Sequence, residues 1–164
     1  IMKSRSLLFA MVLAVVGTFQ VAAQSVQEKV PFTLSGIWQM CFYRSSQPGI
    51  PGELKTGNTL KILSDDGRFS NVVMMPTGAI VIGYGTYTID SDSTYTENVE
   101  KNIHLPQLNN QKNVLHYTLK DQNKVMVLKY FLKDDIDGNR IDSWCYETWK
   151  RVDMPSKYPE NIVR

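Results

Sequence analysis

The chain is poor in the residues that build catalytic and metal centres. Its 164 residues include two cysteines and two histidines. The cysteines form no CxxC pair and no Cys/His cluster, so a structural zinc site lacks its ligands. Also missing are a Gly-x-Ser-x-Gly elbow, a His-Glu-x-x-His motif and a phosphate-binding glycine loop. We therefore expect no enzymatic activity, no metal and no cofactor.

An excess of charge of one sign is missing too. The chain has 18 Lys and Arg residues against 16 Asp and Glu residues, and without Lys3 and Arg5 near its start both counts are 16. A protein that binds nucleic acid usually gathers a basic excess on one face. The balance therefore argues against nucleic acid as a partner.

No apolar run is long enough to span a bilayer, but a shorter one lies near the start. Lys3 and Arg5 precede the uncharged, largely apolar residues 7–16, and a stretch of small residues ends at Ala23. A membrane-spanning helix needs ~20 apolar residues, whereas this order is typical of a secretory signal peptide. We expect residues 1–23 to be a signal peptide, the mature chain to have no transmembrane segment, and the protein to be exported to the periplasm or secreted.

The mature part of the chain is dominated by short apolar runs with period-two alternation, separated by turn residues. No segment has the pattern of an amphipathic helix, and no strand–helix alternation indicates a parallel sheet. We expect an all-β domain over residues 24–152, followed by an extended tail, 153–164. The eight expected strands are 32–43, 58–64, 68–75, 79–90, 94–100, 113–120, 124–132 and 141–152.

Eight antiparallel strands joined mostly by tight turns close as an up-and-down barrel or split into a sandwich. Closure removes both sheet edges, and an eight-stranded barrel is filled by side chains or holds one small ligand. Gly83 and Gly85 suit the sharp bend of a barrel strand. Two long loops, 44–57 and 101–112, interrupt the tight turns, and we expect binding residues there.

The first expected strand contains the sequence Ser-Gly-Ile-Trp, with the glycine at Gly36 and the tryptophan at Trp38. Here the chain resembles the lipocalins, whose first strand carries a Gly-x-Trp motif. The resemblance implies that Trp38 closes one end of a barrel and is covered by a basic residue of the last strand, either Lys150 or Arg151. The chain is more closely similar to the lipocalin-like domain of unknown function 4488 of secreted Bacteroidetes proteins. That similarity implies a lipocalin-like fold, here an eight-stranded antiparallel up-and-down barrel, and an exported protein. Lipocalins also carry a helix near the C-terminus, and no segment of this sequence indicates a clear one.

The phase of the last strand depends on the cysteines. Trp38 and Cys41 are an odd number of positions apart, so they face opposite sides of a regular strand. A disulfide between Cys41 and Cys145, which an exported protein can form, would place Cys145 outside and its neighbours Trp144 and Tyr146 inside. Lys150 would then cover Trp38. A β-bulge would reverse this assignment, and two separately buried thiols are the alternative to the disulfide.

Aromatic side chains suggest what the interior holds. Tyrosine combines an apolar ring with a hydroxyl, which suits a lipid, an aromatic metabolite or a sugar ring, although sheet packing alone also favours aromatic residues. The candidate ligand contacts in the barrel interior are Tyr84, His116, Tyr130, Trp144 and Tyr146.

The expected partner is a small apolar or amphipathic molecule in the barrel mouth, under the two long loops. The alternative is a protein- or glycan-interaction module whose barrel is filled by side chains. A cavity of roughly 300 Å³ or more would favour the first.

Overall fold

The computed structural model describes residues 33–48 and 52–153. The predicted signal peptide, 1–23, and all but the first residue of the predicted tail, 153–164, lie outside the described residues. The described strands are β1 (Gly36–Ser45), β2 (Glu53–Leu54), β3 (Thr59–Leu63), β4 (Arg68–Met75), β5 (Gly78–Ile89), β6 (Thr94–Asn102), β7 (Gln111–Lys120), β8 (Val125–Asp134) and β9 (Arg140–Arg151), and the 3₁₀ turn η1 is Pro106–Leu108.

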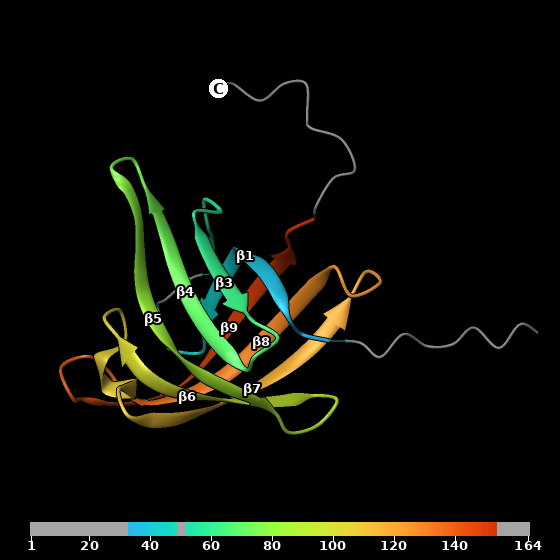
Figure 1. Cartoon of the computed structure of the whole chain (residues 1–164). Helices are drawn as coiled ribbons and strands as arrows, with labels where there is room; N and C mark the ends of the chain where they lie inside the picture. The colour runs from blue at the N-terminus through green and yellow to red at the C-terminus, as the bar shows by residue number, and fades with distance from the viewer. Residues whose placement is uncertain (1–32, 49–51, 154–164) are drawn as a thin grey trace, which may run out of the picture. The chain divides into compact units, whose positions relative to one another are not determined.

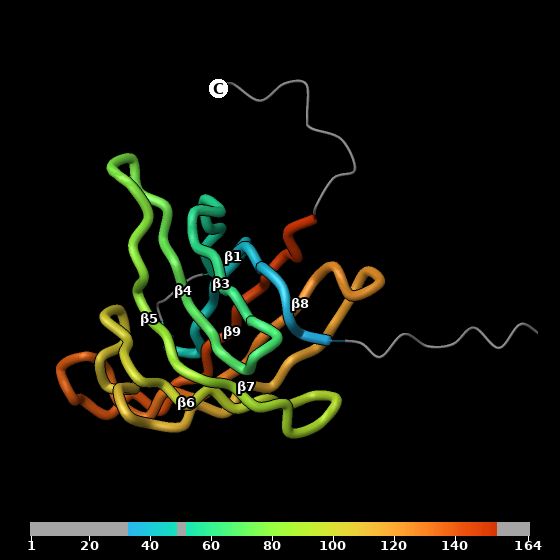
Figure 2. Tube along the Cα trace, viewed as in Figure 1, coloured from blue at the N-terminus to red at the C-terminus, as the bar shows by residue number. Residues whose placement is uncertain are grey.

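Eight of these strands form a closed antiparallel barrel. From β3 to β9 each strand pairs with the next along the chain, β1 pairs with β3, and β1 also pairs with β9 to close the ring (Figures 1 and 2). The two-residue β2 lies in the first long loop and adds to β1, with Leu54 opposite Phe42. The prediction of an eight-stranded up-and-down barrel is confirmed. Since its edges are paired to each other, the sandwich is excluded.

Trp38 closes one end of the barrel. Its side chain is fully buried, and its indole N–H donates a hydrogen bond of 2.9 Å to the Leu34 carbonyl oxygen. The guanidinium carbon of Arg151 lies 4.2 Å from the centre of the indole ring, a distance suited to a cation–π contact. Arg151 is therefore the cover. Lys150 is exposed on the opposite face of β9, so the assignment of Lys150 as the cover is wrong.

Gly36 leaves room for this arrangement. Its φ of +132° is one that residues with a side chain rarely adopt, and a Cβ there would lie 2.8 Å from Nη1 of Arg151. The same Nη1 donates a hydrogen bond of 2.7 Å to the Ser35 carbonyl oxygen. The Gly-x-Trp sequence thus admits the arginine that covers the tryptophan.

A β-bulge at Cys41 reverses the alternation of β1 partway along the strand. Met40 pairs with Trp149 and Phe42 pairs with Thr148, so Cys41 is an extra residue in β1. Before the bulge, Trp38 and Met40 face the core; after it, the inward positions shift by one residue, so that Tyr43 packs against the core. The inward face of β9 is accordingly Ser143, Cys145, Glu147 and Trp149.

This phase overturns two of the predictions. Trp144 and Tyr146 lie on the outer face of β9, so their placement inside the barrel is wrong. Cys41 and Cys145 are both free thiols, so the predicted disulfide is wrong as well. The residue opposite Cys145 in β1 is Ser45, not Cys41. Burial raises the pKa of the Cys145 thiol, and its sulfur lies 3.4 Å from the Tyr43 hydroxyl.

Gly85 permits a close approach of two strands. A Cβ at this position would lie 2.1 Å from the carbonyl oxygen of Asn98 in β6, where the pairing of β5 with β6 shifts register. A shift in the pairing of β5 with β4 lies beside Gly83. These irregularities fall where the two glycines predict a bend, and they curve β5 around the interior.

Candidate functional site

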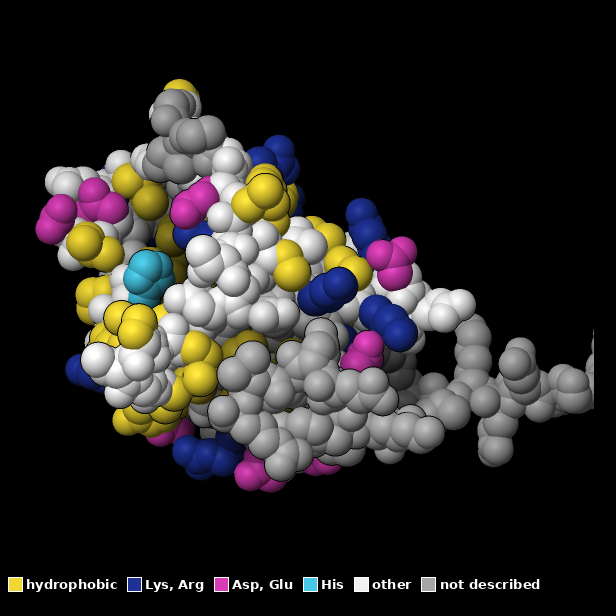
Figure 3. Space-filling model, turned by 90° about the horizontal axis from the view of Figure 1, so that it is seen from above, with side chains coloured by type: hydrophobic (Ala, Val, Ile, Leu, Met, Phe, Trp, Pro, Cys, Tyr) yellow, Lys and Arg dark blue, Asp and Glu magenta, His cyan; other side chains and the backbone are white. Residues whose placement is uncertain are grey.

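The barrel interior is hollow. A cavity of about 540 Å³ extends inward from the end opposite Trp38, well above the ~300 Å³ that a small-molecule site needs. Figure 3 shows the surface hollowed where hydrophobic, basic and acidic side chains meet. Apolar and aromatic lining comes from Met40, Tyr43, Ile82, Leu115, Tyr130, Leu132 and Trp149.

Both long loops contribute to the mouth of the cavity. The first supplies Glu53 and Leu54 of β2 together with Lys55, and the second supplies His104 and Leu105 beside η1. The ammonium of Lys55 bonds the Glu53 carboxylate at 2.8 Å and is partly exposed. The loops that the sequence indicated as binding loops thus line the same opening.

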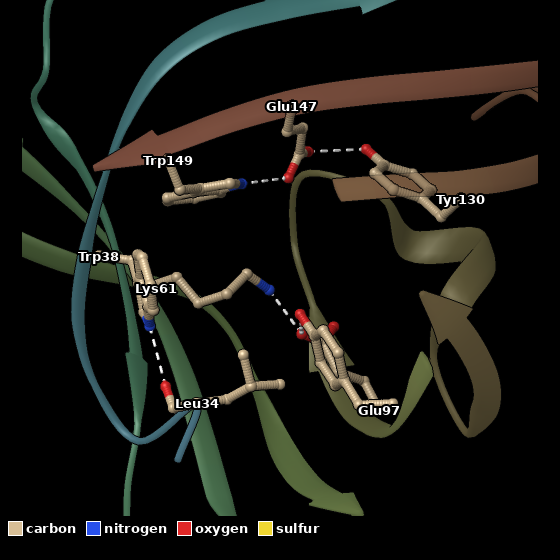
Figure 4. A network of polar contacts seen from close by, with 8 residues as sticks. Leu34, Trp38, Lys61, Glu97, Tyr130, Glu147 and Trp149 are labelled. Atoms are coloured by element: carbon tan, nitrogen blue, oxygen red, sulfur yellow. Dashed lines mark hydrogen bonds and ion pairs between the residues drawn. The ribbon is translucent and has the colours of Figure 1, made fainter. Parts of the chain in front are cut away.

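A buried ion pair crosses the interior. Lys61 in β3 and Glu97 in β6 have side chains only 4% and 5% exposed, and Nζ lies 2.5 Å from Oε1 (Figure 4). The Tyr95 hydroxyl donates a second hydrogen bond to the same oxygen, at 3.2 Å. The ammonium also lies 5.7 Å from the Trp149 ring centre. The interior therefore holds a fixed charged group rather than an uninterrupted apolar wall.

A second carboxylate, Glu147 of β9, lies near this pair. Its Oε1 accepts a hydrogen bond of 2.9 Å from the Tyr130 hydroxyl and its Oε2 accepts one of 2.9 Å from the indole N–H of Trp149. Burial raises the pKa of the Glu147 carboxyl, the positive charge of Lys61 and these two hydrogen bonds oppose the rise, and the negative charge of Glu97 adds to it. We call Lys61, Glu97 and Glu147 the buried charge cluster.

Two asparagine amides lining the cavity lack full hydrogen bonding. Asn113 in β7 is 8% exposed, and no hydrogen bond joins its side chain to any of the residues that the structure describes. Oδ1 of Asn71 in β4 is also buried without a partner in that part of the chain. Buried polar groups normally have partners in protein, water or ligand. These amides therefore offer hydrogen-bonding positions to whatever fills the cavity.

Of the five predicted ligand contacts, the structure places one on the cavity wall. Tyr130 lines the cavity, whereas Tyr84 and His116 are exposed on the outside, so their placement in the interior is wrong. Trp144 and Tyr146 lie on the outer face of β9, and His116 lies on the outer face of β7. There Lys129 lies 4.0 Å from the Trp144 ring centre, and we call these side chains the outer aromatic surface.

The buried charge cluster was missed in the sequence. Its signal is a charged residue on the apolar face of a strand: Lys61 alternates with Leu63, Glu97 with Tyr95 and Val99, and Glu147 with Cys145 and Trp149. Charged residues are almost never fully buried unless paired. Three such positions, in different strands, could have indicated a polar interior.

Residues 33–48 and 52–153 contain neither a membrane-spanning helix nor a group of metal ligands. No helix in them is long and apolar enough to cross a membrane. No three His, Cys, Asp or Glu side chains lie together as metal ligands would.

The chain is similar to a solved lipocalin structure and matches a described protein family. A solved structure of the possum milk whey lipocalin trichosurin, with bound 4-ethylphenol, is 12% identical with a TM-score of 0.42, and the match covers 73% of this chain and 76% of that one. No curated protein sequence matches the chain. Residues 33–160 match the family described as Domain of unknown function (DUF4488), and the chain therefore belongs to that family.

Proposed function

We propose that this protein binds a small amphipathic molecule inside the barrel and does not transform it. The observation that supports this most directly is the cavity of about 540 Å³. That volume falls within the ~300–1,000 Å³ of small-molecule sites. The alternative is a module that binds a protein or glycan through its outer surface. It supposes a barrel filled by side chains, and the cavity argues against that.

The lining favours an amphipathic ligand over a purely apolar one. Leu115, Leu132 and Trp149 offer apolar surface, while Asn113 and the buried charge cluster offer polar atoms. A hydrocarbon would displace water from these polar atoms without replacing its hydrogen bonds, which costs ~1–3 kcal/mol for each group left unsatisfied. A ligand with both kinds of surface avoids that cost.

Titration with N-phenyl-1-naphthylamine, a fluorophore uncharged at neutral pH, tests the proposal. We expect saturable binding with a blue-shifted emission. The Asn113→Trp variant fills part of the cavity without breaking a hydrogen bond between described residues, and should weaken binding by about tenfold or more, that is ~1.4 kcal/mol. The matched control is Val114→Trp, the next residue of β7, whose side chain is exposed.

The control should bind the fluorophore as the unmodified protein does. Melting temperatures of both variants separate loss of the site from loss of the fold, because overpacking a barrel can itself destabilise it. Equal affinity in the Asn113→Trp variant, or weakened binding only in Val114→Trp, would place the fluorophore on the outer surface and contradict the proposal.

Export is a second part of the proposal. Its support is the order of basic, apolar and small residues in 1–23. The intact mass of material recovered from the periplasm or medium should correspond to a chain beginning at Gln24. A mass that includes Lys3 and Arg5 would contradict both the export and the cleavage position.

A further inference from the structure

The interior of the barrel carries an unbalanced charge. Lys61, Glu97 and Glu147 are each at least nine-tenths buried, and with both carboxylates ionised they sum to one negative charge. The other two charged residues that line the cavity, Glu53 and Lys55, lie at the mouth and are paired with each other, so they leave the sum unchanged. Burying charge without a counter-charge is costly in a low-dielectric interior.

One ammonium is shared by two carboxylates. Nζ of Lys61 bonds the Glu97 carboxylate directly, while both oxygens of Glu147 accept hydrogen bonds from neutral donors, Tyr130 and Trp149 (Figure 4). Burial raises the pKa of Glu147 despite the charge of Lys61. Within the described part of the chain, Glu147 therefore has no counter-charge bonded to it and shares the one cation that bonds Glu97.

Other cavity-lining groups favour a positively charged donor. Oδ1 of Asn71 is buried and accepts no hydrogen bond from the described residues, and the amide of Asn113 is unpartnered among them. The ring of Tyr43 also lines the cavity, as does that of Trp149, and aromatic faces attract cations. An ammonium group has three donors and no acceptor, so it matches carboxylate and amide oxygens at once.

We propose that the ligand carries a cationic amine, which binds among Glu97, Glu147 and the asparagine oxygens, while its apolar body lies against Leu105 and Leu132 toward the mouth. The inference rests on the proposed function and names the chemical class of its ligand. A ligand carboxylate would be a third negative charge in the same interior. A neutral alcohol would supply a hydrogen bond but no counter-charge.

Three compounds of matched shape test the charge preference by isothermal titration calorimetry at pH 8. They are 2-(1-naphthyl)ethylamine, 2-(1-naphthyl)ethanol and the carboxylate 1-naphthaleneacetate, which differ mainly in the head group. We expect the amine to bind at least tenfold more tightly than the alcohol, and the carboxylate to bind most weakly. In the Glu97→Gln variant, which brings the interior sum to zero, the amine should lose this advantage over the alcohol.

Two further variants separate charge from folding. Glu100→Gln removes an exposed carboxylate from the same strand and should retain the full preference for the amine. The double variant Lys61→Met/Glu97→Gln keeps the interior sum at one negative charge, through Glu147, and should also prefer the amine, which covers the case in which Glu97→Gln alone fails to fold. A melting curve accompanies each titration.

The outcomes distinguish this inference from the proposed function. If the alcohol binds as tightly as the amine, or if the double variant loses the preference, the inference is overturned and the binding function stands. If neither these three compounds nor N-phenyl-1-naphthylamine binds to the unmodified protein, the proposed function is overturned together with the inference; if only the fluorophore binds, the inference alone is overturned.

Discussion

Replacing Trp38 by alanine should lower the free energy of unfolding by ~3–5 kcal/mol, the range for deleting a buried aromatic side chain from a core. The indole is fully buried and closes one end of the barrel. Its hydrogen bond to the Leu34 carbonyl and its contact with the Arg151 guanidinium are lost with it. Denaturant unfolding of the variant, followed by far-ultraviolet circular dichroism, measures the effect.

The basic residues of β9 provide the matched pair for this prediction. Arg151→Ala removes a cation–π contact and hydrogen bonds to main-chain carbonyls, and should cost ~1–3 kcal/mol. Lys150→Ala changes an exposed side chain and should fall within ~0.5 kcal/mol of the unmodified protein. If the lysine change were the more costly, the bulge at Cys41 and the inward face of β9 would be assigned incorrectly.

Replacing Lys61 by alanine should destabilise the protein by ~3–5 kcal/mol, as expected when one member of a buried ion pair is removed. The change leaves Glu97 and Glu147 buried without a cation between them. Because the variant must bury two carboxylates, its loss of stability should diminish at acid pH, where the carboxylates take up protons. Denaturant unfolding at neutral and acid pH measures both effects.

The double variant Lys61→Met/Glu97→Gln is the control for this second prediction. Replacing both charged groups of a buried pair by neutral ones of similar shape is often close to neutral for stability, so we expect the double variant to be clearly more stable than Lys61→Ala. Equal losses in the two variants would mean that neutralising Glu97 brings no relief, which would contradict the view that an uncompensated carboxylate destabilises Lys61→Ala.

Much of the architecture could be predicted from local patterns. Alternation of apolar and polar residues located the barrel strands, and the Gly-x-Trp sequence at Gly36 and Trp38 indicated how the barrel is closed at one end. The face of β9 could not be predicted, because its phase was inferred from a pairing of Cys145 with Cys41. Cys41 is instead an extra residue in a bulge of β1 with no partner in β9, and a bulge leaves no signature in a period of two. The errors over Trp144, Tyr146, Lys150 and the disulfide all follow from that residue.

The position of the candidate site could be predicted from the sequence, but the charged residues that line it could not. The two long loops marked the mouth of the cavity, since long loops in an economical domain are exposed and carry binding residues. The buried charge cluster depends on the barrel register, which brings Lys61 against Glu97 across 36 positions of sequence. Each of these residues interrupts the apolar face of its own strand, but the pattern of one strand does not show which residue of another strand it meets.

A crystal structure of the protein with N-phenyl-1-naphthylamine is the most direct test of the claim that the barrel holds a small molecule. We expect the fluorophore inside the barrel, in contact with Leu105 and Leu132, with its apolar rings between the two mouth loops and the buried charge cluster. A barrel interior filled by its own side chains, with the fluorophore against the outer aromatic surface around Trp144, would contradict the account.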